Sequence, residues 1–195
     1  MALILAIESS LMLMFTTLNL LWFVLASAIQ TGLIGLLLKL WATSPRMEQA
    51  IKTYIKFMGT GLVLLLAGTL ILGWGHTHVS GGSWAFDLLE LHRAGVGLEF
   101  QTLVFFLLFY GLAIRTPLFP MHGWLPQVAE YGNIAVAPTL LLGLKIGIYG
   151  LLRFVLPLVP EAVQYWQPFV VAFAVVGIFY AALLAMVQED LRRLL

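Results

Sequence analysis

A permanent cation interrupts an apolar stretch that would suit the interior of a lipid bilayer. The stretch "FFLLFYGLAI", residues 105–114, leads directly into Arg115, and Pro117 and Pro120 follow within five residues. Proline lacks a backbone N–H and disfavours helical geometry in the residue before it, so the helix should unwind near residues 115–120. Non-helical backbone is tolerated at membrane depth only inside protein or along a wet cavity. The sequence therefore predicts a broken helix that opens a polar pocket around Arg115. The alternative is an arginine whose side chain extends to the cytoplasmic interface.

Composition places the whole chain in a membrane. Of its 195 residues 62% are hydrophobic and only 10% are charged, whereas soluble domains carry about 25% charged residues. The mean hydropathy is +1.01. A net charge of +1 leaves no basic surface for nucleic acid. The chain has no cysteine, which excludes disulfides, thiolate metal sites and Cys-ligated iron–sulfur clusters, and no other metal-ligand spacing is present.

Apolar segments predict an all-α, polytopic transmembrane helix bundle that forms a single domain over residues 1–195. The first segment lacks a basic start and a small-residue cleavage site, so a membrane span is expected there and not a signal peptide. Residues 75–98, with His76, His78 and the amphipathic piece "WAFDLLELHR", predict an extramembrane loop in which both histidines are solvated. Six spans are expected, at about residues 2–18, 20–42, 55–74, 99–116, 136–156 and 168–187.

The basic residues give the bundle an orientation. One group follows the second predicted span and another follows the sixth, so an even number of crossings separates them. Both groups can therefore lie in the cytoplasm, as the positive-inside rule requires. We expect a multi-pass protein of the bacterial inner membrane. The two groups are Lys39, Arg46, Lys52 and Lys56, and Arg192 and Arg193.

Lys145 is a second charge inside a predicted span. It lies in "APTLLLGLKIGIYGLL", about ten residues from the start of the span, with glycines at positions 143, 147 and 150. A charge at the bilayer centre costs about 2.5–3.5 kcal/mol on insertion scales, so it needs a reason. One explanation is a structural ion pair with a carboxylate on a neighbouring helix. The other is a lysine whose charged form is destabilised by burial, so that it can take up and release a proton.

Glu8 and His122 are further candidates for proton transfer. Glu8 interrupts the apolar run "MALILAIESSLML". If Asn19 marks a turn between two spans, Glu8 and Ala28 lie at depths that differ by about 3 Å. Histidine side chains exchange protons near neutral pH, so His122 could relay protons. The alternative for His122 is a loop histidine whose hydrogen bonds are satisfied.

The stretch "AIRTPLFPMHGWLP…APTLLLGLKIGIYGLLRF" resembles the antiporter-like membrane subunits of respiratory complex I, most closely the M type of NADH–quinone oxidoreductase. "GIFYAALLAMVQEDLRRLL" continues the resemblance, and "LNLLWFVLASAIQTGLIGLLLKLW" is similar to an earlier span of the family. The resemblance covers essentially the whole chain. It implies a fold built from inverted repeats of helices, of which this chain would hold the first repeat and one helix around it, under half a subunit.

In the family, a buried glutamate pairs with a lysine at the broken helix, and a lysine on the next helix carries protons inward. By motif, these positions are Ala28, Arg115 and Lys145 here. Two of the three depart from the family, because arginine cannot be deprotonated in proteins and alanine carries no charge. We therefore expect Glu8, facing the bundle near the depth of Ala28, to supply the displaced carboxylate. The alternative is that Glu8 lies at the lipid headgroups and Gln30 fills the site with a neutral amide.

The resemblance implies a proton-translocating membrane-arm subunit of a complex I-type NADH:quinone oxidoreductase. Lys145, Arg115, Glu8 and His122 would move the protons. The chain would contribute to the enzyme only as a subunit, without a redox centre, cofactor or metal of its own. Its partners would be other membrane-arm subunits and the lipid bilayer. Three alternatives stay open: a cation/proton antiporter subunit, an inorganic-carbon transporter subunit of the same superfamily, and a structural arm subunit that does not conduct.

Overall fold

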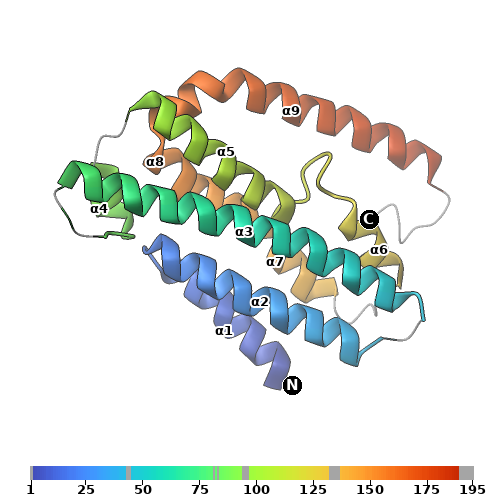
Figure 1. Cartoon of the computed structure of the whole chain (residues 1–195). Coiled ribbons are helices and arrows are strands. Elements are labelled where there is room, and N and C mark those ends of the chain that lie inside the picture. Colours follow the sequence, from blue (N-terminus) through green and yellow to red (C-terminus); the bar gives the residue numbers. More distant parts are fainter. Residues whose placement is uncertain are drawn as a thin grey trace.

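The computed structural model describes residues 2–42, 45–80, 82, 84–93, 97–131 and 137–188, and every regular element in these ranges is helical. Figure 1 shows long helices that run side by side in a bundle, with the short α4 at one end and α6 at the other. The helices are α1 (Ala2–Thr16), α2 (Leu20–Leu40), α3 (Met47–Ser80), α4 (Leu88–Arg93), α5 (Leu98–Arg115), α6 (Trp124–Tyr131), α7 (Ala137–Gly150), a π-helical turn (Leu151–Val155), α8 (Leu156–Leu158) and α9 (Pro160–Val187).

Four of these helices, α2, α3, α5 and α9, are long and apolar enough to cross a membrane, and α1 is a shorter apolar helix. Together with the continuous run from α7 through α8, they correspond to the six predicted spans. The all-α, multi-span fold is thus confirmed. The connection between α2 and α3 and the C-terminal end of α9 lie at the same end of the bundle (Figure 1). Arg192 and Arg193 lie outside the described residues, but the helix that precedes them ends where an even number of crossings from the first basic group requires.

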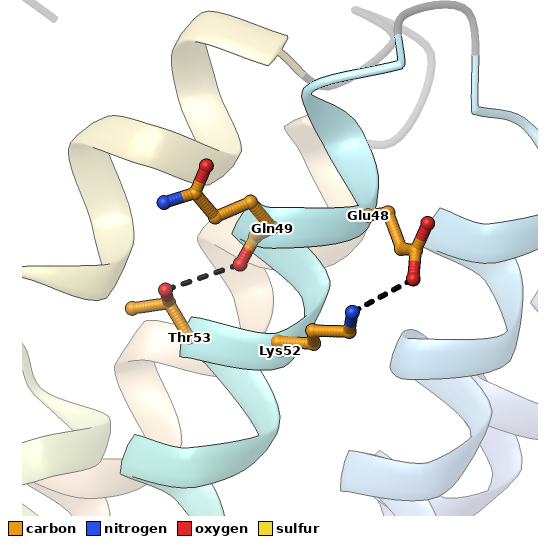
Figure 2. A network of polar contacts seen from close by, with 4 residues as sticks. All are labelled: Glu48, Gln49, Lys52 and Thr53. Atoms are coloured by element: carbon orange, nitrogen blue, oxygen red, sulfur yellow. Dashed lines mark hydrogen bonds and ion pairs between the residues drawn. The ribbon is translucent and has the colours of Figure 1, made fainter.

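The boundaries of α3 differ most from the prediction. Its first turns are polar: Lys52 Nζ lies 2.8 Å from Glu48 Oε1, and the Thr53 hydroxyl donates to the Gln49 carbonyl (Figure 2). Such pairs at helical spacing extend a helix beyond its apolar part. At the other end α3 continues to Ser80, so the predicted loop begins later than residue 75. His76 is buried in this last part of α3, and the prediction that it is solvated was wrong.

The turn between α1 and α2 is the one that Asn19 predicts. The Asn19 side-chain oxygen accepts hydrogen bonds from the backbone N–H groups of Leu21 and Trp22, at 3.0 and 3.2 Å. It thereby satisfies two of the donors that have no partner at the start of a helix. Backbone hydrogen bonds from Leu20 to the Phe86 carbonyl and from Leu88 to the Leu18 carbonyl tie the segment before α4 to this turn. Residues distant in the sequence thus hold this end of the bundle together.

Glycines allow α3 and α5 to cross with their backbones in contact. A Cβ atom on Gly111 would lie 2.9 Å from the Gly61 carbonyl oxygen, and a Cβ on Gly61 would lie 3.0 Å from the Gly111 oxygen. Small residues at such crossings are a common basis of helix association in membranes. The close crossing places the C-terminal end of α5, with Arg115, inside the bundle.

The last long helix, α9, begins at Pro160 and not at Pro168, which lies inside it. A proline at the first helical position leaves no donor unpaired, and the Gln101 side-chain oxygen accepts the next N–H, that of Glu161, at 3.2 Å. α9 contacts α5 largely through aromatic rings, and many of its other apolar side chains are exposed. The rings that meet are those of Phe106 and Phe109 on α5 and Trp166, Phe169 and Phe173 on α9.

Candidate functional site

The predicted break in the fourth span is confirmed, since α5 ends at Arg115. The carbonyls that Pro117 leaves without an ordinary helical donor find other partners. The Leu118 N–H donates to the Ala113 carbonyl at 3.0 Å, in place of the N–H that Pro117 lacks. The Trp124 indole N–H donates to the Ile114 carbonyl at 3.1 Å. The open end of α5 is therefore hydrogen-bonded, as buried backbone at membrane depth has to be.

Trp124 ties α6 to this broken end. Its side chain is 1% exposed, and its ring meets Tyr54 of α3 edge-on, with 5.4 Å between the ring centroids. An indole has one N–H donor and a large apolar surface, so it can fill the space beside the break and hydrogen-bond at the same time. Trp124 thus fills the space at the broken end of α5 and satisfies a backbone carbonyl there.

Arg115 points into the bundle, as predicted. Its side chain is 6% exposed, and Nη2 donates to the Ser27 carbonyl, to Gln30 Oε1 and to Thr31 Oγ1 at 3.2, 3.1 and 3.3 Å. Gln30 lies midway along α2, ten residues before Leu40, which is about 15 Å along the helix axis. The guanidinium is therefore deep in the bundle. The alternative, a side chain extended to the interface, was wrong.

Gln30, and not Glu8 or Ala28, is the partner of Arg115. Ala28 and Glu8 are both exposed, and no described Asp or Glu lies within ion-pair distance of Arg115. The prediction that Glu8 supplies the carboxylate was wrong. The reason on α2 is geometrical: positions 28 and 30 differ by about 200° around a helix. On α1, the side toward the bundle is taken by neighbours of Glu8, namely Ile7, Ser10, Leu11 and Met14.

The alternative that Gln30 fills the site with a neutral amide is confirmed, and one further signal in the sequence favours it. Ser27, Gln30 and Thr31 stand at positions i, i+3 and i+4 within an otherwise apolar helix, and residues with this spacing share one face. All three are buried. A polar stripe of this kind on an apolar helix indicates the face that accepts hydrogen bonds from a buried cation.

A small cavity adjoins Arg115. Its volume is about 20 Å³, enough for about one water molecule. Helices α2, α3, α5, α6 and α7 all contribute to its wall, which consists of Gln30, Ile34, Tyr54, Met58, Arg115, Trp124, Gly143 and Leu144.

Lys145 lies next to this wall but is exposed in the structure, which differs from the expectation that it is buried. Helix α7 contacts the end of α5 at Gly147. A Cβ atom there would lie 2.8 Å from the Thr116 nitrogen and 2.9 Å from the Leu112 carbonyl oxygen, so α7 touches the broken end of α5. Positions 145 and 147 differ by about 200° around the helix. The close contact at Gly147 therefore turns Lys145 toward the side that the described residues leave open.

His122 is held in a different place. It is half-buried, and its ring lies 6.0 Å from that of Phe119 and 5.2 Å from that of Tyr180 on α9. It does not line the cavity beside Arg115. The structure thus joins Arg115 to Gln30 and the adjacent α7, and it separates His122 and Glu8 from them. Within the described part of the chain, no group of three or more His, Cys, Asp or Glu residues could hold a metal ion.

Residues 17–195 match the sequence profile of the family described as NADH:quinone oxidoreductase/Mrp antiporter, TM. The chain belongs to this family. It is 36% identical over 154 residues to NADH-quinone oxidoreductase subunit M of Escherichia coli K12, a match that covers 77% of this chain and 29% of the relative. It is 35% identical over 195 residues to NAD(P)H-quinone oxidoreductase chain 4 of Prochlorococcus marinus NATL2A, covering 98% of this chain and 35% of the relative. The chain thus spans about a third of these proteins.

Solved structures show the same fold. A chain of respiratory complex I from Thermus thermophilus with bound NADH superposes with a TM-score of 0.86 at 29% identity, covering 98% of this chain and 40% of that one. A chain of the membrane-bound sulfane sulfur reductase, an archaeal respiratory membrane complex, superposes with a TM-score of 0.80 at 19% identity, over 98% of this chain and 39% of that one. The second likeness concerns the fold alone.

Proposed function

We propose that this chain is part of a proton-translocating membrane-arm subunit of an NADH:quinone oxidoreductase in a bacterial inner membrane. The observation that carries the proposal is the depth of Arg115. Its guanidinium reaches the middle of α2 beside a cavity that α7 also lines. Family membership and the relatives named above support the same assignment. Other membrane-arm subunits are the proposed partners, and the proposal assigns no redox centre or cofactor to this chain.

In this proposal the two cations have different tasks. Arginine does not release its proton in proteins, so Arg115 acts as a fixed positive charge. Lys145 is the group that takes up and releases protons. It follows Leu144, which lines the cavity, by one residue on α7. Its open side would be covered by neighbouring segments in the assembled complex, where burial destabilises the charged form of a lysine. Proton occupancy of Lys145 would then respond to the fixed charge of Arg115.

The test is proton transfer by the assembled complex. Membrane vesicles oxidise NADH with added quinone while a pH-sensitive dye follows proton uptake. We expect Lys145→Ala to keep NADH oxidation but to lower the number of protons moved per electron, and Lys145→Arg to do the same because arginine does not titrate. The matched control is Lys52→Ala, which removes an exposed lysine paired with Glu48. An unchanged proton-to-electron ratio in Lys145→Ala would contradict the proposal.

A structural subunit that does not conduct is the second candidate. One observation favours it: Gln30 and Arg115, the two groups that meet in the buried site, form a pair that does not exchange protons. This candidate expects Lys145→Ala to leave the proton-to-electron ratio unchanged while deletion of the chain weakens assembly of the complex. The family description also includes antiporters. Proton movement that depends on Na⁺ or K⁺ in the same vesicles would favour an antiporter subunit.

A further inference from the structure

Two buried hydrogen-bond donors beside the cavity have no partner among the residues that the structure describes. They are Gln30 Nε2 and Arg115 Nε, on side chains that are 1% and 6% exposed. The orientation of the Gln30 amide follows from its neighbour: arginine only donates, so the amide oxygen has to face Arg115 Nη2, and Nε2 is left to donate elsewhere. A buried donor without an acceptor costs about 1–3 kcal/mol in general. The site therefore requires an acceptor that the described side chains do not provide.

The site also lacks a negative charge. No described Asp or Glu side chain is buried, and none lies within ion-pair distance of Arg115. The three acceptors of the guanidinium are a carbonyl, an amide and a hydroxyl, all of them neutral. A buried cation without a nearby anion is unfavourable in a low-dielectric environment. An acceptor that also carries negative charge would meet both requirements.

The cavity restricts what that acceptor can be. Its volume of about 20 Å³ holds one particle of about the size of a water molecule. The apolar side chains of Ile34, Met58 and Leu144 form much of the wall. A space of this size favours a monatomic anion over polyatomic anions such as phosphate, sulfate or a free carboxylate. A water molecule would accept from the donors, but it would leave the charge of Arg115 uncompensated.

We propose that this cavity binds one monatomic halide ion, chloride in the cell. The ion accepts hydrogen bonds from Gln30 Nε2 and Arg115 Nε and provides the negative charge that no described side chain supplies. The site is independent of whether the chain moves protons. It makes the folded protein sensitive to chloride as a specific ligand, because an ion that binds only the folded state stabilises it by mass action.

The first measurement is thermal unfolding of the purified complex in detergent. Chloride is compared with gluconate at equal ionic strength and with one cation. We expect the unfolding midpoint to rise with chloride concentration and to level off, with bromide acting in the same way. The second measurement is anomalous diffraction from crystals of the complex grown in bromide. We expect a bromide peak between Gln30 and Arg115. Identical midpoints in chloride and gluconate, together with no peak there, would overturn the proposal.

A substitution that places a carboxylate in the site tests the reason for binding. Gln30→Glu provides Arg115 with its own negative charge, so we expect both the chloride dependence and the bromide peak to disappear. Gln49→Glu adds the same charge at an exposed position of α3 and should retain both. Halide binding that survives Gln30→Glu contradicts the assignment. If Gln30→Glu does not fold, the bromide peak in the unmodified complex decides. Proton flux enters neither measurement, so the outcome is separate from that of the proposed function.

Discussion

Two cations in this protein are stabilised in opposite ways. Lys52 pairs with Glu48 one turn earlier on the same helix, and both side chains are about three-quarters exposed, at 75% and 76% (Figure 2). Arg115 is 6% exposed, and its acceptors belong to another helix, 84 to 88 residues earlier in the chain. Water can replace every contact of the first cation, whereas the second depends on the fold. The ion pair of Lys52 thus depends only on its own helix, whereas the hydrogen bonds of Arg115 depend on the packing of distant helices.

The largest difference in stability is expected between two glutamine substitutions, one beside the buried Arg115 and one beside the exposed Lys52–Glu48 pair. Gln30→Leu keeps the volume but removes the amide that accepts from Arg115. A hydrogen bond to a buried charge contributes about 1.5–3 kcal/mol, so we expect the free energy of unfolding to fall by about that amount. Gln49→Leu, next to the exposed pair, should change it by less than about 0.5 kcal/mol. The measurement is denaturant unfolding in detergent micelles. Equal losses from both variants would show that the buried amide has no special role.

A smaller loss of stability is expected from a change of Trp124, whose indole ring packs against the broken end of α5. Trp124→Phe keeps an aromatic ring but removes the N–H that donates to the Ile114 carbonyl. An unsatisfied buried carbonyl costs about 1–3 kcal/mol, and a new water contact would reduce this. Trp22→Phe is the control, because Trp22 is 58% exposed. The same unfolding assay compares the two. A Trp124→Phe protein as stable as the control would mean that the Ile114 carbonyl has another partner.

The smallest effect is expected at the exposed pair itself. Glu48→Gln removes the ion pair with Lys52, but surface pairs are hydrated and screened by salt. We expect no measurable change in the unfolding midpoint at 0.15 M salt, the physiological value, and a slight decrease at low ionic strength. A midpoint that falls at both ionic strengths would show that this end of α3 depends on the pair. The exposed cation would then contribute to stability as the buried Arg115 does.

Local chemistry made part of the site predictable. The prolines after Arg115 act on the residues beside them, so the end of α5 and the inward position of Arg115 could be foreseen. The same holds for the turn at Asn19, whose side chain caps the helix that follows. In each case the residues that determine the structure are neighbours in the sequence.

The partner of Arg115 could not be found from a motif position alone. Ala28 and Gln30 are two residues apart, and only the rotation of α2 against α5 decides which of them faces the guanidinium. The exposure of Lys145 could not be predicted for a similar reason, since the contact of Gly147 with α5 sets the rotation of α7. The length of α3 was underestimated because apolar residues indicate a membrane span, whereas the polar pairs near Glu48 continue the helix beyond it. Helix rotation and helix ends outside the apolar part depend on contacts between distant segments.

The position of the Arg115 acceptors has a consequence for biosynthesis. Ser27, Gln30 and Thr31 are translated long before Arg115, so α2 is already available when α5 leaves the ribosome. Inserting an arginine deep in a membrane helix costs about 2.5–3.5 kcal/mol when the helix enters alone. Here the newly made helix meets acceptors that are already in place. Efficient insertion of α5 therefore requires that α2 stay beside the insertion machinery until Arg115 has been synthesised, which makes the order of the helices along the gene a part of how the protein is assembled.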